Sequence, residues 1–139
     1  MQQIDGENMF NSNMDKVKKY INQIIDKANS KYTTDCRSIL NVPIKEILNT
    51  TDNKKYINNC SEIELMTIAY KTLFNVSYGL LTSGKLHIYK GLLNPLTPCN
   101  QLINICKMSW QFAVFKGEIS EEQMNEQIEI LYDNINAAG

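Results

Sequence analysis

The residues best suited to chemistry lie in one short stretch that contains Lys85, His87, Tyr89 and Lys90. His87 is the only histidine, so acid–base or metal chemistry based on histidine must use it. A predicted helix begins shortly afterwards, and cations near a helix N-terminus can hold an anion. These four residues therefore form a candidate ligand or anion site. The sequence favours a simpler interpretation, in which His87 is a surface residue of a loop.

The cysteines offer little chemistry. Their separations of 24, 39 and 7 residues contain no C-x-x-C pair, so we expect no zinc site, no other metal and no cofactor. Two of them, Cys99 and Cys106, would lie about 10 Å apart along one helix, which is too far for a disulfide. We therefore expect free thiols at all four positions: Cys36, Cys60, Cys99 and Cys106.

Catalytic alternatives are weak. Cys99 falls in the first turn of its predicted helix, where thiol pKa values drop, and this is the only support for a nucleophile paired with His87. Glu64 and Glu121 resemble an acid/base pair, but their positions at predicted helix starts already account for them. Because no phosphate-loop, dinucleotide, zinc-protease or serine-hydrolase motif occurs, we expect no enzyme. An enzymatic or ligand-binding bundle that uses the His87 region is kept as a weaker alternative.

Charge is divided unevenly along the chain. The 14 Lys and Arg against 15 Asp and Glu give a net charge of −1. Residues 1–110 carry +4, however, and residues 111–139 carry −5, from one basic and six acidic side chains. An acidic surface can be solvated only, or it can steer a basic partner onto the protein. The second interpretation predicts a partner-binding face at Glu118, Glu122, Glu126, Glu129 and Asp133.

Nucleic-acid binding is the main alternative to protein binding. The lysines of the first predicted helix are the only candidates for phosphate contacts, and Asp15 and Asp26 offset them. Arg37 is the single arginine, which leaves almost nothing for bidentate contacts to guanine. A small helical regulator therefore ranks second, behind a protein-interaction module such as an adaptor, an inhibitor or an immunity-type factor.

Aromatic residues occur in two groups at helical spacing. Core packing is the default interpretation of such groups, and a small-molecule pocket between their two helices is the minority one. One group is Tyr70, Phe74 and Tyr78, and the other is Trp110, Phe112 and Phe115.

Helices must position all of these residues. The 139 residues fit one domain, with a flexible tail at 1–11 and a single helical domain at 12–139. Apolar residues at steps of three and four predict a helix over 13–30 and a short helix over 43–49 with Pro43 near its first turn. Residues 50–60 read as a polar loop.

Three further helices have clear end signals. Capping-box patterns at Ser61 and Ser120 open helices over 61–82 and 120–137. Thr97 as N-cap and Pro98 as the first helical residue open the helix over 98–116, which is apolar almost all round and should be buried. Gly117 ends that helix, and the short joint after it implies an antiparallel hairpin.

We therefore predict an all-α bundle of four to five helices, with a short extended segment near residues 85–94. The polar start has no signal-peptide pattern and no stretch could span a membrane, so we expect a cytoplasmic protein. The abundance of Asn, Ile and Lys fits an AT-rich source. The 3–4 spacing over 61–82 fits an internal bundle and a homodimer seam equally well.

Overall fold

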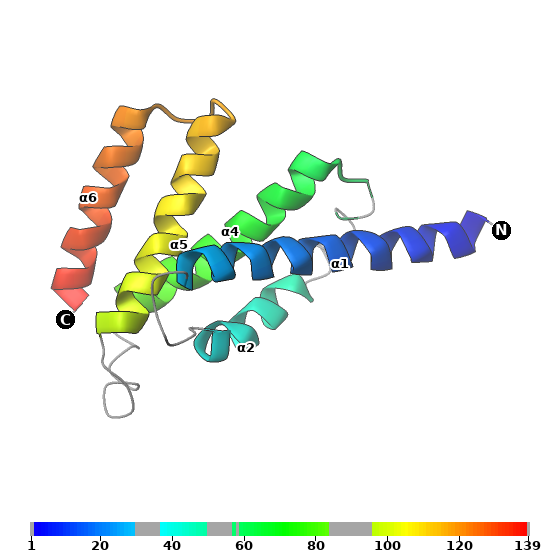
Figure 1. Ribbon diagram of the computed structural model, residues 1–139, viewed down its shortest axis with the longest axis horizontal. Coiled ribbons are helices and arrows are strands. Elements are labelled where there is room, and N and C mark those ends of the chain that lie inside the picture. The colour runs from blue at the N-terminus through cyan, green and yellow to red at the C-terminus, as the bar shows by residue number, and fades with distance from the viewer. Residues whose placement is uncertain (1, 30–36, 50–56, 58, 84–95, 139) are drawn as a thin grey trace.

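The chain is all-α wherever the structure describes it. The computed structural model describes residues 2–29, 37–49, 57, 59–83 and 96–138, and these ranges contain five helices and no strand (Figure 1). The predicted fold class is confirmed, whereas the predicted extended segment at 85–94 lies outside these ranges. The helices are α1 (Gln2–Asn29), α2 (Arg37–Leu48), α4 (Glu62–Thr82), α5 (Leu96–Phe115) and α6 (Glu121–Ala138).

Helix α4 is the centre of the arrangement. It packs against each of the other four helices, while α1 also packs against α5. Helices α5 and α6 run antiparallel beside each other, which confirms the predicted hairpin (Figure 1). Among the described residues, no helix combines the length and the apolar character that crossing a membrane requires.

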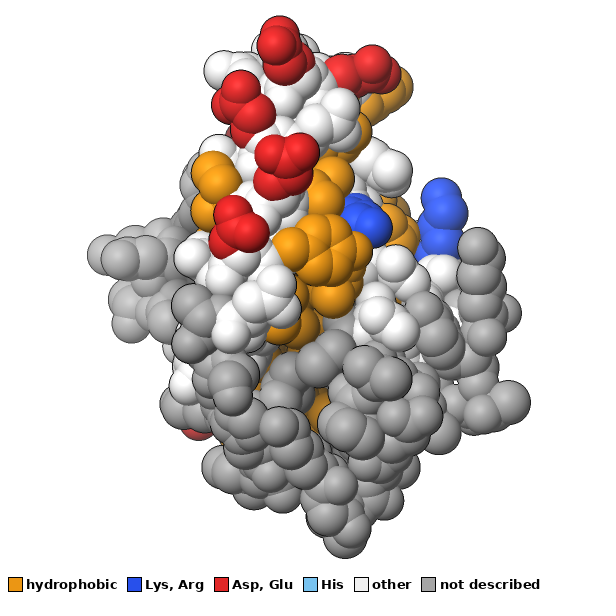
Figure 2. All heavy atoms as spheres, turned by 90° about the vertical axis from the view of Figure 1, so that its left-hand side faces the viewer, with side chains coloured by type: hydrophobic (Ala, Val, Ile, Leu, Met, Phe, Trp, Pro, Cys, Tyr) orange, Lys and Arg blue, Asp and Glu red, His pale blue; other side chains and the backbone are white. Residues whose placement is uncertain are grey.

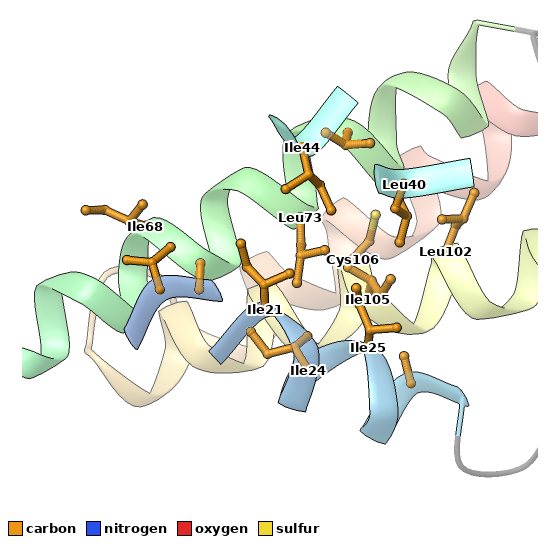
Figure 3. Close-up of a cluster of buried hydrophobic side chains, with 14 of the residues drawn as sticks. Ile21, Ile24, Ile25, Leu40, Ile44, Ile68, Leu73, Leu102, Ile105 and Cys106 are labelled. Atoms are coloured by element: carbon orange, nitrogen blue, oxygen red, sulfur yellow. The ribbon is translucent and has the colours of Figure 1, made fainter. Parts of the chain in front are cut away.

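The core draws side chains from all five helices. Leu73 of α4 is completely buried and lies among apolar residues of α1, α2 and α5 (Figure 3). Among the described side chains of α6, only Leu131 is completely buried. The labelled members in Figure 3 are Ile21, Ile24, Ile25, Leu40, Ile44, Ile68, Leu73, Leu102, Ile105 and Cys106.

Helix α1 starts earlier than its apolar pattern predicts. It begins at Gln2 rather than Asn13, so the backbone of residues 2–11, expected to be a tail, continues the helix. Extending an existing helix costs little per residue and needs no apolar face, provided that no proline interrupts it. In Figure 1 this end of α1 extends past the other helices.

The second helix also starts earlier than predicted, and the loop after it contains an unexpected core residue. Helix α2 begins at Arg37, so Pro43 lies inside it and not near its first turn. A proline there removes one backbone hydrogen bond, which the burial of Leu40 and Ile44 on the same helix offsets. Ile57, in the predicted polar loop, is completely buried, and its carbonyl accepts a hydrogen bond from Asn13 Nδ2 at 2.9 Å.

Both predicted capping boxes are present. At α4 the Ser61 hydroxyl accepts from the Glu64 backbone N–H, and the Glu64 carboxylate accepts from the Ser61 backbone N–H. At α6 Ser120 and Gln123 make the same reciprocal pair, at 3.1 and 2.9 Å. These bonds satisfy backbone donors that would otherwise lack partners at the first turn.

Helix α5 begins two residues before its predicted start and ends as predicted. Its first residue is Leu96, so Thr97 is inside the helix and is not its N-cap. Gly117 adopts φ +77°, the left-handed conformation that favours glycine. The Gly117 N–H bonds to the Val114 carbonyl and the Glu118 N–H bonds to the Ala113 carbonyl, which is the Schellman pattern.

Candidate functional site

Four of the five predicted contact acids form one stripe on α6. Glu122, Glu126, Glu129 and Asp133 follow at steps of four, three and four residues, a spacing that returns to one face of a helix. All four side chains are exposed, and Figure 2 shows acidic side chains running along this helix. We call these four residues the acidic stripe.

The charge of the acidic stripe is not neutralised nearby. Within the described part of the chain, no ion pair joins any of its members to a cation. Glu122 lies in the first turn, where the helix dipole favours it, but the other three lie beyond the reach of that effect. Glu118, the fifth predicted acid, differs because its Oε1 lies 2.9 Å from the Lys116 Nζ.

Exposed apolar side chains lie on the same hairpin. Phe115 is 78% exposed, Ile130 is 45% exposed and Tyr132 is 41% exposed. Orange apolar atoms lie beside the red carboxylates in Figure 2. The Lys107 ammonium sits 5.5 Å from the centre of the Tyr132 ring. This surface therefore combines charge with apolar area, as protein-binding surfaces do.

The prediction that α5 is buried almost all round is wrong at its C-terminal end. Phe115 is the last residue of α5, and α6 turns away after Gly117 without covering it. The sequence signal for this exposure is the position of Phe115 two residues before Gly117, the glycine that ends the helix.

Helix α6 is attached to the bundle by a narrow strip. Only Leu131 is completely buried, while Met124, Ile128 and Ile135 are half-buried against the core. One polar contact supports them, a hydrogen bond of 2.9 Å from Asn134 Nδ2 to the Tyr78 hydroxyl. The opposite side of the helix is left to solvent.

The candidate site around His87 is not described. Lys85, His87, Tyr89 and Lys90 all lie outside the described residues, so the structure does not test this prediction. The backbone of Cys99 lies in α5, but its side chain is likewise outside the description. The other two described cysteines form no disulfide: Cys60 is partly buried and Cys106 is completely buried.

On α1, the helix that the sequence predicts to be basic, one lysine is paired with a carboxylate of another helix. Lys16 Nζ donates to Glu62 Oε1 of α4 at 2.6 Å, and the Tyr20 hydroxyl donates to the other oxygen of the same carboxylate. The hydrogen bond from Lys16, followed by that from Tyr20, lowers the pKa of Glu62. Lys16 is therefore partly neutralised, which weakens the case for a phosphate-binding face on α1.

Four of the aromatic residues line a cavity between α4 and α5. Tyr70 and Phe74 of α4, together with Trp110 and Phe112 of α5, line a cavity of about 150 Å³. The Tyr70 and Phe112 rings are stacked, and the Phe74 and Trp110 rings meet edge to face. Burial raises the pKa of Tyr70. Trp110 and Phe112 are buried and Tyr70 and Phe74 pack against the core, as the default interpretation predicts. The cavity lies between the two helices named in the minority interpretation, and binding of a small molecule there stays a prediction.

Metal binding and similarity to known proteins add no further assignment. Among the described residues, no group of three His, Cys, Asp or Glu side chains could hold a metal ion. The chain matches no protein-family model, no curated protein and no solved structure.

Proposed function

We propose that this chain is a non-enzymatic protein-interaction module that binds a basic partner through the acidic stripe of α6. A cytoplasmic adaptor, inhibitor or immunity-type factor has this character. Cys60 and Cys106 form no disulfide, which is compatible with a reducing compartment.

One observation carries the proposal. Four exposed carboxylates share one helix face, and none has an ion-pair partner among the described residues. Like charges on neighbouring turns repel one another and do not stabilise the helix. A cationic partner surface would relieve that repulsion and would be steered toward it over the range of a Debye length.

The apolar side chains beside the acidic stripe supply the contacts that would hold a complex together. Exposed charges mainly set the rate and the specificity of encounter, whereas buried apolar and aromatic contacts hold a complex together. Ile130 and Tyr132 lie on the same helix as the acidic stripe, and Phe115 lies at the adjoining helix end. The partner surface is therefore basic with apolar side chains between its cations.

The test compares two double charge reversals. Glu122→Lys with Glu129→Lys breaks the stripe, while Asp15→Lys with Glu46→Lys changes exposed acids on α1 and α2. Both variants change the formal net charge from −1 to +3, so any difference between them reports position and not total charge.

The measurement is capture of proteins from nuclease-treated lysate, with helical circular dichroism as the control for folding. We expect the wild type and the α1/α2 variant to retain one stoichiometric protein that the stripe variant loses. About 0.5 M salt should also weaken this capture, because screening then shortens the range of exposed charges to a few ångströms. Equal capture by both variants would reject the assignment of the surface.

The alternative proposal, a nucleic-acid-binding regulator, is tested by measuring binding to duplex DNA. That function requires binding at low salt that falls about tenfold or more between 50 and 200 mM salt when a few phosphates are contacted. Replacement of the exposed Lys18 and Lys19 by Glu would then abolish it. If the wild type does not bind duplex DNA at low salt, this alternative is rejected.

A further inference from the structure

The cavity between α4 and α5 is a second feature, separate from the acidic stripe. Its described lining residues combine four aromatic rings with a few polar groups, and none of them belongs to α6. Ala113 occupies one position of the wall, where its small side chain leaves the space open. The aromatic and basic residues of the wall are Tyr70, Phe74, Trp110, Phe112, Lys71 and Lys116.

The size and the walls of the cavity favour a single planar ring. An apolar cavity of about 150 Å³ holds a molecule the size of benzene, and this cavity has about that volume. Aromatic walls prefer stacked or edge-to-face contacts with another ring. Phe74 and Trp110 already show the edge-to-face form, with ring centres 5.2 Å apart, and Tyr70 and Phe112 show the stacked form at 4.4 Å.

Lys116 places an ammonium group in the wall of the cavity, where it is largely shielded from solvent. Its side chain is only 14% exposed, and its ammonium lies 4.8 Å from the centre of the Phe112 ring. Its nitrogen lies 2.9 Å from Glu118 Oε1 in an ion pair and donates a hydrogen bond of 3.0 Å to the Thr67 hydroxyl. An ammonium has three donors, so one is left for a ligand oxygen.

The positive charge of the lining residues favours an anionic ligand. Among the described lining residues, Lys71 and Lys116 are basic and Glu118 is the only acid, which leaves one net positive charge. A cationic ligand would have to displace Lys116 from the Phe112 ring and would be repelled by both lysines. A carboxylate would instead add a charge-assisted hydrogen bond to the ammonium.

From this geometry we propose that the cavity binds a small monocyclic aromatic carboxylate. The ring lies among Tyr70, Phe74, Trp110 and Phe112, and the carboxylate faces Lys116 with Lys71 at the rim. This inference does not depend on the function proposed for the acidic stripe.

Trp110 makes the proposal directly measurable, because it is the only tryptophan and it lines the cavity. Three probes of one ring but different charge are titrated while tryptophan fluorescence is followed: benzoate, benzyl alcohol and benzylamine. We expect a saturable change with benzoate and at least about tenfold weaker binding of the other two, as the loss of one charge-assisted hydrogen bond implies. No saturable change with benzoate, or equal binding of all three probes, would overturn the proposal.

Two variants locate the binding. Lys116→Met keeps the aliphatic stem but removes the ammonium, and it should weaken benzoate binding about tenfold. Lys107→Met is the matched control, because Lys107 lies on α5, the helix directly upstream of Lys116, but faces Tyr132 and is not part of the cavity wall. Unchanged affinity of Lys116→Met, or equal losses in the two variants, would contradict the predicted contact.

Ala113→Leu adds a direct test of the space itself. The larger side chain fills part of the cavity and should abolish the benzoate response while circular dichroism stays that of the wild type. If this variant does not fold, the comparison of Lys116→Met with Lys107→Met still decides the proposal. Retained binding in a folded Ala113→Leu protein would place benzoate elsewhere and overturn the site.

Discussion

The Phe112 ring of α5 lies on the Tyr70 ring of α4, with ring centres 4.4 Å apart and planes inclined by 19°. Three residues later, Phe115 lies 6.4 Å from Phe112 on its own helix but is 78% exposed. Two phenylalanines in one turn of α5 thus have opposite surroundings. Their contributions to stability should differ accordingly.

Replacement of each phenylalanine by alanine tests this difference. Phe112→Ala should lower the free energy of unfolding by about 3 kcal/mol, because it removes a buried ring and leaves a void beside the cavity. Phe115→Ala should change it by no more than about 0.5 kcal/mol, as exposed positions do. Urea unfolding followed by circular dichroism measures both. Equal losses would mean that Phe115 is buried in solution.

Two glycines in helical surroundings should respond oppositely to the same substitution. Gly117→Ala should cost about 1–2 kcal/mol, because its φ of +77° is unfavourable for a residue with a Cβ atom. Gly79→Ala, inside α4 with nothing within 4 Å of the added carbon, should instead stabilise by about 0.5–1 kcal/mol. Thermal unfolding of the two variants provides the comparison, and a stabilised Gly117→Ala protein would contradict the Schellman ending.

Two buried polar side chains should also respond differently to substitution by alanine. The Ser77 hydroxyl is completely buried and has no hydrogen-bond partner among the described residues, so Ser77→Ala should leave stability unchanged or raise it by up to about 1 kcal/mol. Asn13→Ala removes the donor to the Ile57 carbonyl and should cost about 1–3 kcal/mol. A marked loss in Ser77→Ala would reveal a partner for this hydroxyl.

The Cys106 thiol should be unreactive in the folded protein. Burial raises the pKa of Cys106 from 9.0 to about 12. At pH 8 only about one thiol in ten thousand is then ionised, and the thiolate is the reactive form. A variant with Cys36, Cys60 and Cys99 replaced by Ser should react with a disulfide reagent only after urea unfolding. Rapid labelling without urea would show that Cys106 is accessible.

The same shift in pKa has a consequence for stability at high pH. The unfolded thiol releases its proton near pH 9, whereas the folded one keeps it until about pH 12. The stabilisation from this group is therefore complete below pH 9 and falls as the pH rises toward 12. Cys106→Ala lacks this contribution, so its melting temperature should fall less than that of the wild type between about pH 8 and pH 10.

Local signals were sufficient to predict the helix ends that depend on neighbours in sequence. Ser61 with Glu64, Ser120 with Gln123, and Gly117 could be recognised because a cap is made by residues within one turn of each other. The acidic stripe was predictable for the same reason, since its exposure follows from helical spacing and from the half-buried apolar stripe on the opposite side.

Features that depend on distant contacts could not be predicted in this way. Pro43 inside α2 and Ile57 in the core are both sustained by burial against other helices, which local propensity does not report. The early start of α1 could not be predicted, because residues 2–11 lack the apolar pattern by which helices are recognised.

Patterns in the sequence are enough to predict that the chain forms amphipathic helices, where most of them end, and which face of the last one is acidic. They do not predict that Phe112 is covered while Phe115 is exposed, or that a space is left between α4 and α5 beside Lys116, because these features arise only when the helices pack together. The reason is physical. Helical periodicity records which side of one helix is apolar, whereas a cavity or an exposed ring depends on how far apart two helices pack and where a neighbouring helix turns away.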